Sequence, residues 1–348
     1  MLKNYLKTAL RNLWKSKGFS AINIIGLATG LSVFLMIILY VTDELSYDAY
    51  NTNADRIYRL DAELYFNNTG FHAATSPEPL AYTLIKDYPQ IEQMVRFRDA
   101  GDILVKKDNQ NIREHHAVFA DSTFFKVFTV CLIHGNPATA LNDPNSIVID
   151  ESTAKRYFNS TDAVGKTLYV DNSANCKITA VIKDISPQSH FHFSFIRPFR
   201  DSYRGNADNW LSNGAQSYIL LKPGVSTEFV QTCINSTINK YLSKQLEALV
   251  HTSLGDLESK GNYFHYRLMP LRKIHLYSNL SYEFEANGNV TYVYIFSVIA
   301  VFILLIACVN FMNLFTARSA NRAKEVGIRK VAGSLRKHLI SQFLAESV

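Results

Sequence analysis

The chain has 348 residues, of which 47% are apolar and 19% are charged. This length suits two or three domains, and the composition excludes a disordered or a fibrous chain. The net charge of +6 is unevenly distributed, because residues 1–42 contribute +5, residues 43–289 contribute −4 and residues 290–348 contribute +5. A soluble nucleic-acid-binding protein would not divide its bases in this way, so we expect no nucleic-acid partner.

Residues 1–17 combine basic side chains with one apolar helical face. This pattern predicts a cytoplasmic amphipathic helix that lies on the inner membrane surface. A cytoplasmic extension of the following apolar run is the alternative. The residues on the apolar face are Leu2, Leu6, Leu10, Leu13 and Trp14.

Two long apolar runs adjoin the basic ends. Residues 18–42 and 290–317 contain no Asp, Glu, Lys, Arg or His. About 20 apolar residues span a bilayer as a helix, so both runs predict transmembrane helices. The alternatives are buried core helices of a soluble protein and, for the first run, a cleaved signal peptide. That run is too long for a signal peptide and lacks a small-residue cleavage site.

Basic side chains flank each predicted span on the side of the nearer chain end. The positive-inside rule therefore predicts that both ends of the chain are cytoplasmic and that residues 43–289 are extracytoplasmic. Membrane lipid is the partner that both spans imply. The residues that determine this topology are Lys3, Lys7, Arg11, Lys15, Lys17, Arg318, Arg322 and Lys324.

Residues 43–289 show patterns typical of both strands and helices. Polar and apolar residues alternate over 58–66, and apolar residues from Phe229 to Leu242 recur with a 3.6-residue period. Ser76-Pro77 predicts an N-cap followed by the first residue of a further helix, which Pro89 limits. Other strands are predicted at 91–98, 103–107, 112–119, 146–150, 167–171, 176–185, 190–196, 216–222 and 263–270.

These elements predict an α+β extracytoplasmic domain of two lobes, flanked by the two transmembrane helices. A strand–helix–strand unit near each end would form one subdomain with both membrane connections, and a strand-rich lobe at about 101–215 would be inserted in it. The domain has Cys131, Cys176 and Cys233, whose spacing predicts no disulfide.

Motifs for catalysis or cofactor binding are weak. Gly165-Lys166-Thr167 resembles the end of a phosphate-binding loop, but Ser160 stands where that loop requires Gly. His190 and His192 could present two metal ligands on one strand face, but no third ligand is recognisable by its spacing. A polar strand face is the favoured interpretation. We therefore expect a non-catalytic chain with no cofactor and no metal.

The segment after the second span carries the most informative chemistry. Asn310 and Asn313 share one helical face near the cytoplasmic end, where polar side chains usually bond between spans. Residues 318–333 are rich in bases but also contain Glu325 and the apolar residue Val326. This segment could anchor the chain to anionic lipid or form a helix that docks a partner, and the residues alone leave both open.

Several motifs resemble ABC transporter permeases of the MacB/FtsX type. Two follow the second span, Ile306-Ala-Cys-Val-Asn310 and Lys324-Glu-Val-Gly-Ile-Arg-Lys330. Two follow the first span, Asp43-Glu-Leu-Ser-Tyr-Asp48 and Arg56-Ile-Tyr-Arg59. Asp184-Ile-Ser-Pro187 with Ser189-His190 is also similar to the domain of that family. Together these motifs cover the whole chain.

The resemblance implies a MacB-like periplasmic core domain and an FtsX-like permease segment in the bacterial inner membrane. It implies a permease subunit that transmits movement from a separate cytoplasmic ABC ATPase, which binds ATP and Mg²⁺. Its role would be export of peptides, including antimicrobial peptides, of toxins or of lipoproteins, or envelope signalling. The residues at the ATPase contact would be Glu325, Val326, Gly327, Arg329, Lys330 and Gly333.

The resemblance also implies further partners and a longer chain. The partners would be a second permease unit or a homodimer partner, with a periplasmic adaptor or an outer-membrane component as additional candidates. Permeases of this type have four spans per unit, so residues 318–348 would form a coupling segment that leads into a third span. The alternative is a two-span membrane sensor with an extracytoplasmic ligand-binding domain. A membrane-anchored hydrolase is disfavoured, because no catalytic motif is present.

Overall fold

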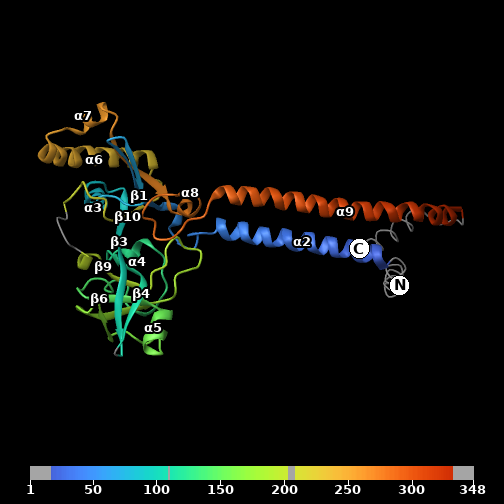
Figure 1. Ribbon diagram of the computed structural model, residues 1–348, viewed down its shortest axis with the longest axis horizontal. Helices are drawn as coiled ribbons and strands as arrows, with labels where there is room; N and C mark the ends of the chain where they lie inside the picture. The colour runs from blue at the N-terminus through green and yellow to red at the C-terminus, as the bar shows by residue number, and fades with distance from the viewer. Residues whose placement is uncertain (1–16, 109, 203–207, 332–348) are drawn as a thin grey trace. The chain divides into compact units, whose positions relative to one another are not determined.

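The computed structural model describes residues 17–108, 110–202 and 208–331 (Figure 1). They divide into two compact units, one formed by helices near the two chain ends and one formed by residues 44–289. The described strands all belong to the second unit, which we call the domain.

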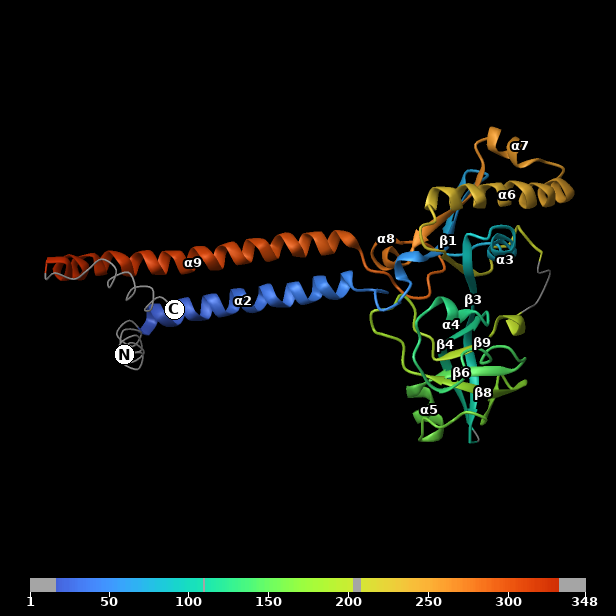
Figure 2. The same cartoon turned by 180° about the vertical axis from the view of Figure 1, so that it is seen from behind.

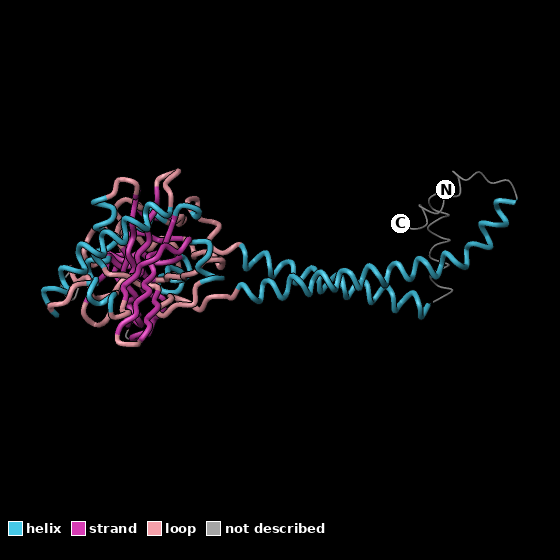
Figure 3. Tube along the Cα trace, turned by 90° about the horizontal axis from the view of Figure 1, so that it is seen from above, coloured by secondary structure: helices cyan, strands magenta, loops and turns pink. Residues whose placement is uncertain are grey.

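Two long helices form the first unit. Helix α2 spans Lys17–Leu45 and helix α9 spans Val290–Val331. The stretches Ile24–Leu45 and Val290–Asn310 are long and apolar enough to cross a membrane. The two helices run side by side (Figure 3). Helix α9 continues without a break past residue 317, through most of the basic segment.

Eleven described strands form one sheet in the domain. Their order is β11-β1-β10-β3-β4-β9-β6-β8-β5, with β2 beside β1 and β7 beside β3 and β8. The strands are β1 (Ile57–Phe66), β2 (Thr69–Ala73), β3 (Ile91–Lys107), β4 (Gln110–Ala120), β5 (Leu132–Gly135), β6 (Ser146–Asp150), β7 (Thr167–Val170), β8 (Ala174–Ile182), β9 (Phe195–Pro198), β10 (Gln216–Leu221) and β11 (Tyr263–Pro270). The helices are α3 (Glu78–Asp87), α4 (Phe124–Val127), α5 (Glu151–Phe158), α6 (Thr227–Val250), α7 (Leu254–Ser259) and α8 (Ile274–Tyr277), with 3-10 turns η1 (Ala54–Arg56), η2 (Phe199–Ser202) and η3 (Leu271–Lys273).

The first lobe consists of two strand–helix–strand units, β1-α3-β3 and β10-α6-β11. Strands β1 and β3 both pair antiparallel with β10, and strands β10 and β11 both pair antiparallel with β1. Each unit therefore encloses a strand of the other, which is the double split arrangement of ferredoxin-like folds. Helices α3 and α6 contribute their apolar faces to one core with β1 and β10 (Figure 2).

Helix α6 illustrates why the local sequence forms this lobe. The hydroxyl of Ser226 accepts a hydrogen bond from the backbone N–H of Phe229 and caps the first turn. Val230, Ile234 and Ile238 then recur at helical spacing and are almost fully buried. The predicted apolar period therefore corresponds to the face that packs on the sheet.

The second lobe is inserted between β3 and β10. Strand β3 belongs to both lobes, and Gly101 adopts a φ of +65° where its pairing with β4 shifts register. Glycine reaches this backbone region at little cost, so the strand bulges without ending. Strands β4 to β9 and helix α5 complete this lobe, at the opposite end of the domain from α6 (Figures 1 and 2). The predicted two-lobed α+β fold is confirmed.

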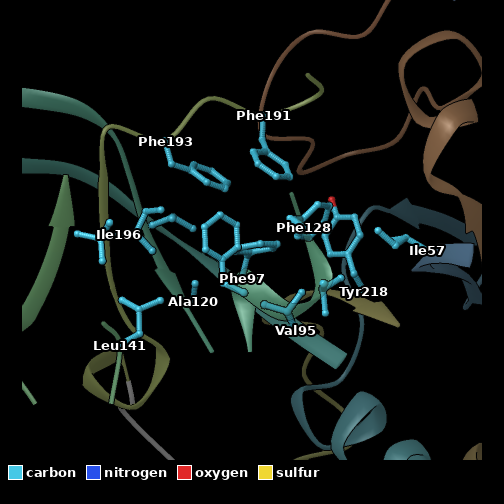
Figure 4. Close-up of a cluster of buried hydrophobic side chains, with 14 of the residues drawn as sticks. Ile57, Val95, Phe97, Ala120, Phe128, Leu141, Phe191, Phe193, Ile196 and Tyr218 are labelled. Atoms are coloured by element: carbon cyan, nitrogen blue, oxygen red, sulfur yellow. The ribbon is translucent and has the colours of Figure 1, made fainter. Parts of the chain in front are cut away.

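An aromatic cluster joins residues of both lobes around Phe97 (Figure 4). Phe97 in β3 is fully buried, and its ring centroid lies 5.4 to 6.1 Å from six other rings. These rings belong to Phe124, Phe128, Phe191, Phe193, Tyr218 and Phe284. Phe191, Phe193 and Phe284 lie outside the strands, so their burial holds two loops in place.

The structure corrects the predicted strand at 190–196. Only residues from Phe195 onward pair with neighbouring strands, and the preceding residues form a loop. The alternating pattern has another cause there, since Phe191 and Phe193 enter the aromatic cluster while His190 is itself buried. A loop whose side chains find partners on both sides shows the same alternation as a half-buried strand.

Two smaller predictions also change. The structure has one strand, β3, where two strands at 91–98 and 103–107 are predicted, because the bulge at Gly101 preserves the pairing with β4. Ser76 does not cap helix α3. Its hydroxyl donates to the hydroxyl of Ser217 instead, and Pro77 takes the capping position without a side-chain hydrogen bond.

Replacing Phe97 with alanine should strongly destabilise the domain. The substitution leaves a cavity among six rings, and comparable core truncations cost about 3–5 kcal/mol. The matched control is Phe66→Ala, since Phe66 is 44% exposed and should lose less than about 1 kcal/mol. Denaturant unfolding followed by circular dichroism measures both. Equal losses in the two variants would contradict the central role of Phe97.

Candidate functional site

The face of α9 that packs on α2 follows a seven-residue spacing. Val293, Ala300 and Ala307 are buried, whereas most other apolar side chains of the helix are exposed. Ala307 lies opposite Gly30, because a Cβ on that glycine would lie 3.4 Å from the Cβ of Ala307. Small residues at such positions allow two apolar helices to approach closely.

Asn310 continues this contact face. Its Nδ2 atom lies 3.5 Å from the place that a Cβ on Gly26 would occupy, so the amide lies against α2. Asn313, which the sequence pairs with it, belongs to α9, but its side chain lies outside the described part of the structure. The structure therefore positions one of the two predicted polar contacts beside the partner helix.

Most residues predicted at the ATPase contact lie in the last turns of α9. The backbone from Glu325 to Lys330 is helical, and Gly333 lies outside the described residues. Among the topology determinants, Arg318, Arg322 and Lys324 also belong to α9, and Lys17 begins α2. The remaining determinants, Lys3, Lys7, Arg11 and Lys15, precede the first described residue.

A buried polar network lies in the domain near the segments that follow α2 and precede α9 in sequence. Its centre is Arg59 of β1, whose side chain is fully buried. The guanidinium donates to Asp61 at 2.6 Å, to Glu283 at 2.5 and 2.9 Å, and to the hydroxyl of Ser278 at 2.8 Å. Burial lowers the pKa of Arg59, but the charges of Asp61 and Glu283 outweigh this effect and raise it.

The first and last segments of the domain meet at His275. Its Nε2 atom lies 3.0 Å from a carboxylate oxygen of Glu44, and its ring stacks on Tyr47 with centroids 3.4 Å apart. A Cβ on Gly288 would lie 2.8 Å from Glu44 Oε2 and 2.8 Å from His275 Nε2, so position 288 has no room for a side chain. Residues before and after the domain's core are therefore in direct contact.

A loop of the inserted lobe contacts the same two segments. His190 bonds to Asp48, three residues after the end of α2, with Nδ1 and Oδ1 2.8 Å apart. His192 bonds to Glu285, five residues before α9, with Nδ1 2.9 Å from each carboxylate oxygen. The prediction of a polar strand face at these histidines is wrong, because both lie in a loop before β9 and bond to carboxylates.

Sequence reasoning singled out His190 and His192 only as weak candidate metal ligands, and it did not select Arg59 or the carboxylates as site residues. Asp48, Arg59 and His190 stand in the motifs that carry the family resemblance, which was a usable signal. Glu283 and Glu285 flank the partly buried Phe284, so a Glu-Phe-Glu alternation close to a span also marked the site. Within the described ranges, no group of three or more His, Cys, Asp or Glu side chains is arranged to hold a metal ion.

Replacing Arg59 with methionine should cost about 3–5 kcal/mol of unfolding free energy, because two carboxylates would stay buried without a countercharge. Arg267→Met is the matched control. Arg267 pairs with Glu63, but its side chain is 64% exposed, so its loss should cost less than about 1 kcal/mol. Chemical unfolding of both variants tests this difference. A small loss for Arg59→Met would mean that the network is not stabilising.

Comparison with known proteins places the chain in a family. A model described as the MacB-like periplasmic core domain matches residues 20–236, and one described as the FtsX-like permease C-terminal matches residues 297–348. No curated protein matches the chain.

One solved structure agrees with the fold of the domain. A domain described as part of a permease protein from Porphyromonas gingivalis is 20% identical to this chain, with a TM-score of 0.53. The match covers 63% of this chain and 91% of that one. The periplasmic region of MacB from Actinobacillus actinomycetemcomitans is 15% identical, with a TM-score of 0.40 and coverages of 64% and 91%. The extracellular domain of the noncanonic ABC-type transporter YknZ from Gram-positive bacteria is 13% identical, with a TM-score of 0.37 and coverages of 61% and 99%.

The MacB-like model alone matches more than half of the chain, and the FtsX-like model matches the helix that follows the domain. The two apolar helices accord with an inner-membrane location, and permeases of this family act with an ABC ATPase. The chain belongs to the ABC transporter permeases of the MacB/FtsX type.

Proposed function

We propose that this permease transmits the conformational changes of a separate cytoplasmic ABC ATPase to its extracytoplasmic domain. ATP and Mg²⁺ would bind in that ATPase, and this chain would catalyse no reaction and hold no cofactor. The transmitted movement would serve export of peptide, toxin or lipoprotein-type substrates, or envelope signalling. The supporting argument rests on helix α9.

Helix α9 is a single helix of 42 residues. It begins directly after the domain, contains the apolar stretch Val290–Asn310 and continues for about 30 Å past Asn310, at about 1.5 Å per residue. An unbroken helix moves largely as one body, so a displacement of Glu325–Lys330 would also displace Val290. This continuity is the observation that carries the proposal.

The contacts inside the domain support the same role. A movement of the residues at Val290 would act on Glu283 and Glu285, which are bonded to Arg59 and His192. It would also act on Gly288, which lies against Glu44 and His275. Two arrangements of such packed and bonded groups are what a transmitted switch requires.

The proposal includes the topology and partners that the sequence implies. Both chain ends would be cytoplasmic, because the basic residues cluster at residues 1–17 and 318–337. A second permease unit or a second copy of the chain would complete the membrane part, with an adaptor or outer-membrane component as further partners. The two-span sensor is less well supported, since residues 297–348 match an FtsX-like permease model.

Charge reversal in the last turns of α9 should uncouple the permease from its ATPase. With the full-length protein and its cognate ATPase in nanodiscs, Glu325→Lys and Arg329→Glu should each lower permease-stimulated ATP hydrolysis about fivefold or more. ATP hydrolysis by the ATPase alone stays unchanged. Lys244→Glu, an exposed position on α6, is the control and should stimulate normally. Normal stimulation by both α9 variants would overturn the docking assignment.

Thiol labelling tests the topology. Cys131 is exposed in the domain, so a membrane-impermeant maleimide should label it in intact spheroplasts. A Cys131→Ser, Ser334→Cys variant should be labelled only after permeabilisation, because residue 334 would lie in the cytoplasm. Labelling of this variant from outside would contradict the proposed orientation.

A further inference from the structure

The loop of residues 186–193 holds two histidine rings whose four nitrogens all have partners. His192 has Nδ1 2.9 Å from the carboxylate oxygens of Glu285 and Nε2 2.9 Å from the carbonyl oxygen of Ser186. His190 has Nδ1 2.8 Å from Asp48 Oδ1 and Nε2 2.8 Å from the hydroxyl of Tyr218. Whether each partner donates or accepts a hydrogen bond determines which ring nitrogens carry protons.

His192 faces acceptors at both nitrogens. An ionised carboxylate and a backbone carbonyl can only accept hydrogen bonds, so each ring nitrogen must donate. A neutral imidazole has one N–H and would leave a lone pair directed at an oxygen. The geometry of His192 therefore requires the doubly protonated imidazolium.

His190 holds Asp48 through Nδ1, which donates to Asp48 Oδ1 at 2.8 Å. Its Nε2 atom lies 2.8 Å from the hydroxyl of Tyr218, which also lies 3.1 Å from the carbonyl oxygen of Gln216. An ionised carboxylate can only accept, so this contact requires a proton on Nδ1 of His190.

We propose that His190 and His192 are positioning residues that fasten Asp48 and Glu285 to one loop of the inserted lobe, with His192 as an imidazolium ion. We call these four residues the histidine clasp. Loss of one ring proton from His192 would turn a hydrogen bond into contact between two lone pairs and open its half of the clasp. The consequence for transmission rests on the proposed function, but the protonation state of His192 does not.

Asp48 depends strongly on this clasp. Its side chain is fully buried, and His190 is the hydrogen-bond partner of its Oδ1 atom. Its other carboxylate oxygen is buried without a hydrogen-bond partner among the described residues. A buried carboxylate is costly once its hydrogen-bond donor is removed. The Asp48 contact should therefore depend strongly on the ring of His190.

The charges around His192 set the pH range of its half of the clasp. The hydrogen bond to Glu285 raises the pKa of His192, against an opposing effect of burial, and Asp48 raises it further. Burial raises the pKa of Glu285, but His192 and, to a lesser degree, His116 lower it below its ordinary value. Asp99, Asp102 and His116 face the pair across a cavity of about 170 Å³.

The signs of these shifts define a window. The contribution of His192 is complete below its ordinary pKa of 6.5 and is lost as the pH rises through the raised value. The contribution of Glu285 is complete above its ordinary pKa of 4.5 and is lost as the pH falls through the lowered value. The contact between His192 and Glu285 should be fully closed between these limits and should open in alkaline surroundings.

Nitrogen NMR of the histidine-labelled full-length protein in nanodiscs tests the protonation states. The chain has ten histidines, so His190→Gln and His192→Gln assign the two signals by their absence. We expect His192 to show two protonated nitrogens at about pH 6, and Glu285→Gln to lower the titration midpoint of His192 by roughly one pH unit. A neutral His192 ring at about pH 6 would overturn the clasp.

Transmission is tested in proteoliposomes with the ATPase outside and the domain in the lumen. Stimulated ATP hydrolysis should fall at least about threefold when only the luminal pH rises from about 6 to about 8.5. His192→Gln should give the low value at both pH values, whereas His265→Gln, an exposed histidine on β11, should behave as the unmodified protein. A pH response that survives in His192→Gln would contradict the positioning role.

The two experiments separate the two proposals. If the ATPase does not respond to the permease at any luminal pH while the NMR signals of His192 are those of imidazolium, the proposed function fails and the clasp stands. If stimulation is normal but the His192 ring is neutral at about pH 6, the clasp fails and the proposed function stands.

Discussion

The buried guanidinium of Arg59 is the interaction on which the connections of the domain depend. A charge with no solvent contact is tolerated only when opposite charges and hydrogen bonds surround it. Asp61 supplies one partner from the same strand, but Glu283 must come from a segment 224 residues away. That requirement fixes the chain just before α9 against β1, and every other contact of this segment follows from it.

The position of Glu283 determines where the next two residues, Phe284 and Glu285, lie. Phe284 enters the aromatic cluster around Phe97, and Glu285 reaches His192. The loop that carries His192 has the same construction, because Phe191 and Phe193 are held in the aromatic cluster while His190 and His192 bond to carboxylates. Apolar burial and ion pairing thus hold together the same two segments, the residues before α9 and the loop that carries His192. A displacement of one segment should therefore displace the other.

These contacts give the permease a physical basis for transmission. Helix α9 is one continuous body, and the residues before it are bonded to both the first lobe, through Arg59, and the inserted lobe, through His192. The packed aromatic rings deform little, since interiors are close-packed. The polar contacts are directional and can break one at a time, so they are the natural points at which two arrangements of the domain would differ.

The sequence by itself determined what depends on local pattern. The two apolar runs, the end-weighted basic charge, the period of α6 and strands such as β6 and β11 all follow from residues close together in the chain, and they match the helices and strands found. The family motifs located Asp48, Arg59 and His190 without showing what they contact. Loop 190–194 could not be distinguished from a strand, because alternation alone does not say whether the backbone is paired.

Only the tertiary structure decided the site. The pairs His190–Asp48 and Arg59–Glu283 join residues 142 and 224 positions apart. No local pattern encodes such a pairing. Any buried charge requires a partner, but the residues around it in the sequence do not show which distant residue that partner is. The protonation of the histidines is decided at the same level, because it depends on which acceptors the fold brings to each ring nitrogen.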